Sequence, residues 1–155
     1  MTFSLRPFSP EHQEFLLQLY ADTRRDEIAS FGWPAAQQEA FLLMQFKAQQ
    51  SWYETAYSGA DHQLIFVDGE PVGRILVFRE SGANRLVDIA LLSAFRSQGI
   101  GTQLLRDLIG QSAREGLAVR LQVLKTNRAK HVYERLGFVE IGEDGMYVQM
   151  EKTSP

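Results

Sequence analysis

The loop from Arg96 to Gly101, RSQGIG, contains residue types that could bind an anion. It follows an apolar stretch typical of a strand and precedes a pattern typical of a helix. At such a junction Gly99 and Gly101 let backbone N–H groups approach a phosphate, because no Cβ atom stands in the way, and the helix N-terminus adds partial positive charge. Arg96 and Thr102 would add a guanidinium and a hydroxyl group. The spacing predicts either a pyrophosphate site or a glycine turn that only permits close packing of the helix.

Two other types of phosphate site agree less well with the residues around this loop. A mononucleotide P-loop needs a lysine and then a serine or threonine after its second glycine, whereas Thr102 and Gln103 follow Gly101. A dinucleotide-binding loop needs a third glycine shortly afterwards, and the next glycine here is Gly110. Neither site is predicted.

Hydrophobic periodicity and turn residues predict the elements that would position this loop. In chain order they are strand 2–8, helices 11–22 and 35–49, strands 63–67, 72–79 and 86–92, helix 99–115, strand 118–124, helix 128–136, and strands 138–141 and 146–150. Asp68-Gly69 favours a hairpin turn, and Gly116 would end the helix that follows the loop. The stretch DEIASFGW between the first two helices is a candidate substrate loop. The order βααβββαβαββ predicts an α/β fold of the mixed α+β kind, in which helices cover a mixed sheet.

Composition limits the classes of protein to which the chain could belong. Its 155 residues, 45% of them hydrophobic, suffice for one core, and we expect a single domain over residues 1–155. A net charge of -3 without a long basic run argues against a nucleic-acid partner. The sequence shows neither a signal peptide nor a long apolar run, so a soluble cytoplasmic protein without a membrane partner is expected. Because cysteine is absent and the three histidines lack ligand spacing, no metal site is predicted.

Two motifs in the second half of the chain carry a resemblance to a known family. The segment LLSAFRSQGIGTQLL resembles the acetyl-coenzyme A (acetyl-CoA) binding motif of the GNAT superfamily of N-acetyltransferases, and VLKTNRAKHVYERLGF is similar to a second motif of that superfamily. The resemblance covers about residues 71–150, and the earlier part matches only in element order. It implies a GNAT-like, mostly antiparallel sheet of about seven strands flanked by about four helices. It also implies acetyl-CoA as cosubstrate and, since closing hairpins of this kind often dimerise in the family, a homodimer.

The same resemblance implies roles for individual residues. Leu91 and Leu92 would offer backbone groups to the pantetheine arm, Asn127 would contact its amides, and the Tyr133 hydroxyl would lie near the thioester sulfur. The residues expected around the pyrophosphate are Arg96, Ser97, Gly99, Ile100, Gly101 and Thr102. Many members have Arg-Gly before the second half of this loop, whereas Ser97 and Gln98 stand there in this chain.

Acetyl transfer to an amine by direct attack, through a tetrahedral intermediate, needs a neutral amine, a stabilised oxyanion and a proton for the leaving thiolate. We predict Tyr133 as the general acid, although without the resemblance a core tyrosine would be favoured. Asp88, in the apolar stretch RLVDIALL, is the leading candidate for the general base, because burial raises the pKa of a carboxyl group. Because side chains alternate between the two faces of a strand, Asp88 is expected on the same face as Leu86. If that face turns away from the cleft, Asp88 is structural, and Glu80, His62 or water remain as candidates.

The remaining expectations concern the oxyanion and the acceptor. A backbone N–H within residues 91–93, beside a bulge that separates two strands, is expected to polarise the carbonyl. The acceptor is predicted to be an amine of a small molecule, an amino acid or a peptide. Its pocket could be lined by Trp33, Trp52, Tyr53 and Tyr57, or these residues could only contribute to packing. Asp26 and Glu27 could attract the amine or form a solvated helix end. The alternative function is an acyl-CoA-binding sensor or module with a degenerate acceptor site.

Overall fold

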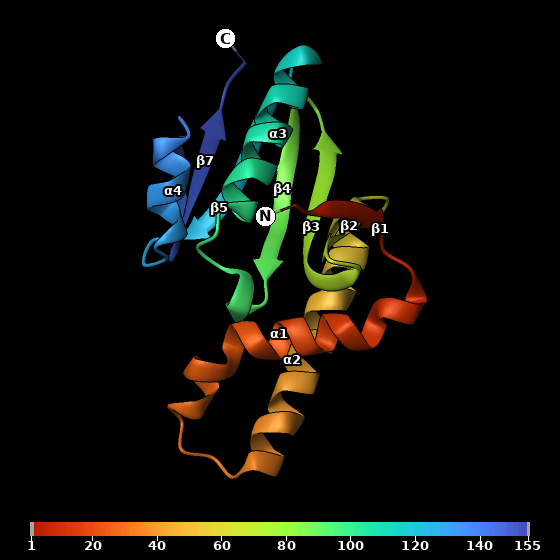
Figure 1. Cartoon of the computed structure of the whole chain (residues 1–155). Coiled ribbons are helices and arrows are strands. Elements are labelled where there is room, and N and C mark those ends of the chain that lie inside the picture. Colours follow the sequence, from red (N-terminus) through yellow and green to blue (C-terminus); the bar gives the residue numbers. More distant parts are fainter. Residues whose placement is uncertain (1, 155) are drawn as a thin grey trace.

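A seven-stranded sheet forms the centre of the computed structural model, which describes residues 2–154 (Figure 1). Its strands are β1 (Ser4–Pro7), β2 (Asp61–Val67), β3 (Glu70–Glu80), β4 (Ala83–Leu91), β5 (Ala118–Leu124), β6 (Val139–Asp144) and β7 (Tyr147–Lys152). They lie in the spatial order β1-β2-β3-β4-β5-β7-β6, and every neighbouring pair is antiparallel except β4 and β5. The predicted mixed, mostly antiparallel sheet and the element order are confirmed.

Helices cover both faces of the sheet. The described residues form α1 (Gln13–Ala29), α2 (Ala35–Ala56), α3 (Ile100–Arg114) and α4 (Ala129–Arg135), with short 3-10 helices η1 (Pro10–His12) and η2 (Ser93–Phe95). Strand β2 alternates between the two faces: Leu64 and Phe66 pack with Leu16 of α1 and Phe46 of α2, whereas Ile65 joins the larger core under α3. Within residues 2–154, no helix combines the length and the apolar character that crossing a bilayer requires.

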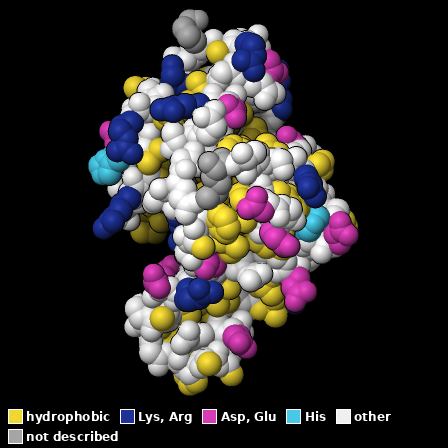
Figure 2. Space-filling view, viewed as in Figure 1, with side chains coloured by type: hydrophobic (Ala, Val, Ile, Leu, Met, Phe, Trp, Pro, Cys, Tyr) yellow, Lys and Arg dark blue, Asp and Glu magenta, His cyan; other side chains and the backbone are white. Residues whose placement is uncertain are grey.

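Local turn chemistry was predicted well, but the first two helices were predicted too short. Asp68 and Gly69 adopt positive φ angles of 51° and 80°, the backbone that joins β2 and β3 in a tight hairpin. Helix α1, however, continues to Ala29, so half of the DEIASFGW stretch is helical. The remaining loop, residues 30–34, lies at the projecting end of the α1–α2 hairpin, away from the sheet (Figures 1 and 2). The first helix was predicted too short because the helical periodicity continues past Asp22, and none of residues 30–34 lines the cavity described below.

Strands β4 and β5 separate soon after they begin. Their parallel pairing covers only Ala83 to Arg85 on β4, so the rest of β4 has an open side. A β-bulge lies in the same strand: Leu76 of β3 pairs with Asp88 and Val77 with Leu86, which leaves Val87 as the extra residue. The expected bulge therefore exists, but it lies before residues 91–93. The separation opens a space between the carboxyl-terminal half of β4 and helices α3 and α4.

Candidate active site

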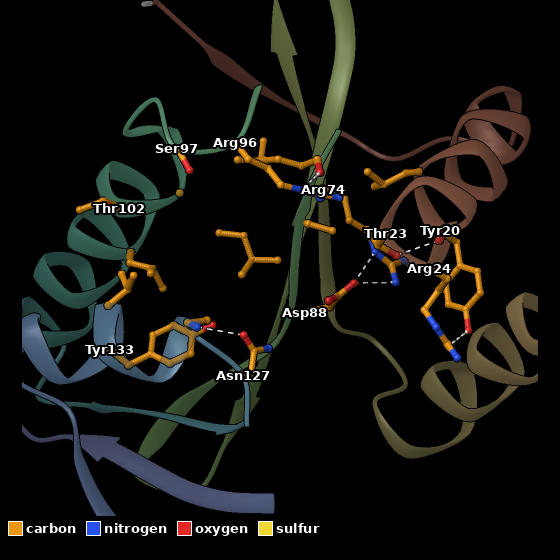
Figure 3. A pocket seen from close by; sticks show the side chains of 18 of the residues that line it. Tyr20, Thr23, Arg24, Arg74, Asp88, Arg96, Ser97, Thr102, Asn127 and Tyr133 are labelled. Atoms are coloured by element: carbon orange, nitrogen blue, oxygen red, sulfur yellow. Dashed lines mark hydrogen bonds and ion pairs between the residues drawn. The ribbon is translucent and has the colours of Figure 1, made fainter. Parts of the chain in front are cut away.

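A cavity of about 690 Å³ lies beside the open part of β4, between α1 on one side and α3 and α4 on the other (Figure 3). It brings together most of the residues that the sequence analysis selected. Those that line it are Asp88, Leu91, Arg96, Ser97, Gly99, Gly101, Thr102, Asn127 and Tyr133. Leu92 and Ile100 take other positions: the Leu92 N–H donates to the Val72 carbonyl at 2.8 Å, and the Ile100 side chain is buried in the core.

The RSQGIG loop has the backbone of an anion cradle. Gly99, immediately before α3, has φ +89°, and Ser97 has φ +61°. The left-handed backbone at Ser97 explains why glycine would suit this position, and a serine there carries some strain. A Cβ atom added to Gly99 or Gly101 would meet nothing within 4 Å, so open space lies directly over the first turn of α3. The loop and the helix N-terminus therefore fit a pyrophosphate group.

Arg96 points to protein groups, contrary to the expectation that its guanidinium faces the anion. Its Nε donates to the Leu91 carbonyl at 2.9 Å and its Nη2 to Asp22 Oδ2 at 3.2 Å. Asp22, on α1, also accepts a hydrogen bond from the Ser93 N–H at 2.8 Å. The sequence analysis missed Asp22, since its partners lie more than 70 residues further along the chain. The Asp22 carboxylate thus holds the start of the loop against α1.

The open edge of β4 offers fewer backbone groups than expected. Leu92 donates its N–H to the Val72 carbonyl of β3, so Leu91, the preceding residue of the extended chain, directs its N–H and carbonyl to the other side, toward the cavity. The Leu91 carbonyl already accepts a hydrogen bond from Arg96, and the Ser93 N–H already donates one to Asp22. Of the three residues predicted to polarise the substrate carbonyl, Leu91 is the one whose N–H remains directed into the cleft.

Tyr133, in the second half of α4, and Asn127, just before that helix, come from the other wall of the cavity. The Tyr133 side chain is 9% exposed and packs edge-on against Phe138. Burial raises the pKa of the Tyr133 phenol to about 12, and the nearby charge of Asp88 adds to the effect. Asn127 Oδ1 accepts the Ala129 N–H at 2.9 Å, so its side-chain NH₂ group is the donor left for a ligand.

Asp88 lies in an ion pair and not in an isolated apolar setting. Its Oδ2 accepts from Nε of Arg74 at 2.8 Å, and the Arg74 side chain, 8% exposed, also binds Gln49. The Val87 bulge places Asp88 on the α1–α2 face of the sheet and Leu86 on the opposite face. The prediction that these two residues share a face is therefore wrong. The sequence analysis missed Arg74. Its contact with Asp88 depends on the register between β3 and β4, which counting residues along β3 does not give.

The two competing base candidates lie outside this cavity. Glu80 binds Arg85 and Arg120 at the far end of β3. His62, on β2, lines a neighbouring cavity with Tyr53 and Arg74, and its ring stacks on Phe8 at a centroid distance of 4.7 Å. Burial, with a further contribution from the Arg74 charge, lowers the pKa of His62 to about 4.

His62 should make the protein less stable in acid. Because unfolded histidine takes up a proton near pH 6.5 and the folded ring only near pH 4, the stability present above pH 6.5 is lost as the pH falls through this window. We expect a loss of about 1–2 kcal/mol in the free energy of unfolding. This is less than the full difference between the folded and unfolded pKa values would give, because the ring is partly exposed. Urea unfolding at pH 7 and pH 4.5 should show a smaller loss in His62→Phe. His131→Phe, at an exposed position, should retain the wild-type loss.

Comparisons with known proteins give the family of the chain. A family model described as "Acetyltransferase (GNAT) domain" matches residues 20–152. The chain therefore belongs to the GNAT acetyltransferase family, as the two motifs indicated. A search of curated protein sequences gave no match.

Solved structures share the fold at low sequence identity. PaiA N-acetyltransferase from Thermoplasma acidophilum, in complex with coenzyme A, is 19% identical with a TM-score of 0.75, and 99% of each chain is covered. An acetyltransferase from Thermus thermophilus is 18% identical with a TM-score of 0.71, covering 99% of this chain and 97% of that one. The ribosomal-protein-S18-alanine N-acetyltransferase from Escherichia coli is 15% identical with a TM-score of 0.65, covering 99% and 94%. These likenesses show the fold.

Proposed function

We propose that the protein transfers the acetyl group of acetyl-CoA to the nitrogen of an amine. The observation that carries the proposal is one cavity lined by the RSQGIG loop, the open edge of β4 and the buried Tyr133. Membership of an acetyltransferase family supports it, as does the coenzyme A bound in the PaiA structure.

The residues divide into those that hold the cosubstrate and those that handle protons. The N–H groups at Gly99, Ile100 and Gly101 would bind the pyrophosphate, with Ser97 and Thr102 beside them. The Leu91 N–H and the Asn127 amide would bind the pantetheine arm. The sequence analysis assigned the pyrophosphate to Arg96 as well, but its contacts to Asp22 and Leu91 favour a role in shaping the loop.

Acetyl-CoA supplies an acetyl group activated as a thioester. The amine nitrogen would form a bond to the acetyl carbon, giving a tetrahedral intermediate, and the C–S bond would then break to give an amide and free coenzyme A. Tyr133 would protonate the departing sulfur, because a phenol carries its proton at neutral pH and burial raises the pKa of this one further, to about 12. Asp88, directly or through water, would take the proton that the amine loses. Its Oδ2 holds Arg74, which leaves Oδ1 for this purpose.

A calorimetric titration with acetyl-CoA and with coenzyme A, followed by a turnover assay with a panel of amines, tests the proposal. Micromolar binding and release of free thiol that depends on an added amine are the expected results. A folded protein that binds neither compound would rule the proposal out. Tight binding without turnover of any amine would favour the alternative of an acyl-CoA sensor.

Asp22 provides a second test of this assignment. Asp22→Ala removes the acceptor for the Ser93 N–H and the partner of Arg96, so the loop should lose its fixed position and acetyl-CoA should bind about tenfold more weakly. The kcat at saturating acetyl-CoA should change little, since no reacting group is removed. Asp26→Ala removes an exposed carboxylate from the same helix and serves as control. Equal affinities in the wild type and both variants would contradict the role of Asp22.

A further inference from the structure

The half of the cavity that faces α1 and α2 lies apart from the proposed cosubstrate residues. Figure 3 shows Arg74 and Asp88 near the middle, with Tyr133 and Asn127 on one side and Tyr20 and Arg24 on the other. The polar residues of this half are Tyr20, Thr23, Arg24, Gln49, Arg74 and Asp88. If the cosubstrate occupies the α3–α4 side, as proposed above, the acceptor must enter through this half.

Guanidinium groups outnumber carboxylates among the residues that line the acceptor half. Among the described residues that line the cavity, Asp88 is the one carboxylate, and Arg74 already neutralises it through a buried ion pair. Arg24 is the second guanidinium of this half. Its own counter-ion, Glu27, is 58% exposed and lies outside the cavity lining, at 2.9 Å from Arg24 Nε. An acceptor in the cavity therefore meets two guanidinium groups and one carboxylate.

The aromatic rings near this half are also occupied by cations of the protein. The Arg24 guanidinium lies over the Tyr20 ring at 5.6 Å, and the Arg74 guanidinium lies over the Tyr53 ring at 5.4 Å. These faces are therefore not free to receive the ammonium groups of a ligand. Trp33 lies elsewhere, because it packs with Phe31 and Phe41 at the end of the helical hairpin. A polyamine would find repulsion here without compensating contacts.

We propose that the acetyl acceptor is an amine that carries an acidic group, such as a free amino acid or a short peptide with a free carboxylate. The inference rests on the proposed function. The amine would lie at Asp88, close to Tyr133, and the acidic group at Arg24. The Arg24 side chain donates to Glu27 through Nε and Nη2 and to the Tyr20 hydroxyl through Nη1. A guanidinium has five N–H donors, so two of them remain for a carboxylate of the acceptor.

Matched acceptors test this assignment directly. Amino acids and dipeptides would be compared with their C-terminal carboxamides and with 1,4-diaminobutane and spermidine, using thiol release to measure kcat/KM. The free acids should exceed their carboxamides by about tenfold or more, because a hydrogen bond to a charged partner discriminates at that level. Arg24→Gln should abolish the difference, and Arg24→Lys should restore part of it. Arg79→Gln, which removes the same charge from an exposed position on β3, should keep the wild-type ratio.

The outcomes separate this inference from the proposed function. Carboxamides or polyamines that react as well as the free acids, or an unchanged ratio in Arg24→Gln, would overturn the acceptor assignment while leaving acetyl transfer intact. Binding of acetyl-CoA without acetylation of any free acid would also overturn it. Failure to bind acetyl-CoA at all would instead remove the proposed function, and the acceptor assignment with it.

Discussion

Replacing Tyr133 with phenylalanine is expected to lower kcat by about a hundredfold or more, the range typical of a lost general acid. The substitution removes only the hydroxyl group, and the phenylalanine ring keeps the edge contact with Phe138. Affinity for acetyl-CoA should therefore stay within about twofold of the wild type. Steady-state kinetics combined with calorimetric titration would separate the two quantities.

The pH dependence of this variant gives an independent check. Because burial raises the pKa of the phenol to about 12, Tyr133 stays protonated as the pH rises through the range in which the enzyme can be assayed. The ratio of wild-type to variant kcat should consequently be constant between pH 6 and pH 9. Tyr147→Phe, on β7 outside the cavity, is the matched control and should retain wild-type kcat. An unchanged kcat in Tyr133→Phe would exclude the general-acid role.

The second large effect is expected from Gly101→Asp in the first turn of α3. A unit charge about 4 Å from a phosphate oxygen costs about 4 kcal/mol at an effective dielectric constant of 20, enough to weaken coenzyme A binding by about a hundredfold or more. The fold should tolerate the change, because the new Cβ meets no atom within 4 Å. An acidic residue near a helix N-terminus and the loss of a helical glycine are both stabilising.

This design predicts changes of opposite sign in binding and stability. Thermal denaturation should give a Tm equal to or above that of the wild type, while calorimetry shows the loss of coenzyme A affinity. Gly110→Asp places the same charge further along α3, where the nearest atom to a new Cβ is 3.6 Å away, and should leave affinity unchanged. If Gly101→Asp bound coenzyme A as tightly as the wild type, the pyrophosphate would not lie over this turn.

Local patterns in the sequence were sufficient to predict the order of elements and the glycine loop before α3. Glycine at positions such as Gly99 and Gly116 reports a backbone with positive φ, and this requirement depends only on neighbouring residues. The Asp68-Gly69 turn and the helix of α3 follow from equally short patterns. Tyr133 was assigned from a motif, and the structure places it in the same cavity as the loop.

The tertiary structure decided how these parts act together. A bulge at Val87 turned Asp88 to the face opposite to that of Leu86, and no periodicity in β4 signals an extra residue that is defined only by pairing with β3. The contacts of Arg74 and Asp22 likewise join segments far apart in the sequence, so they depend on strand register and helix docking. The sequence by itself predicted a glycine loop that fits an anion and selected the phenol of Tyr133. Packing between distant segments determined which carboxylate meets which guanidinium, and hence the charge that an acceptor encounters.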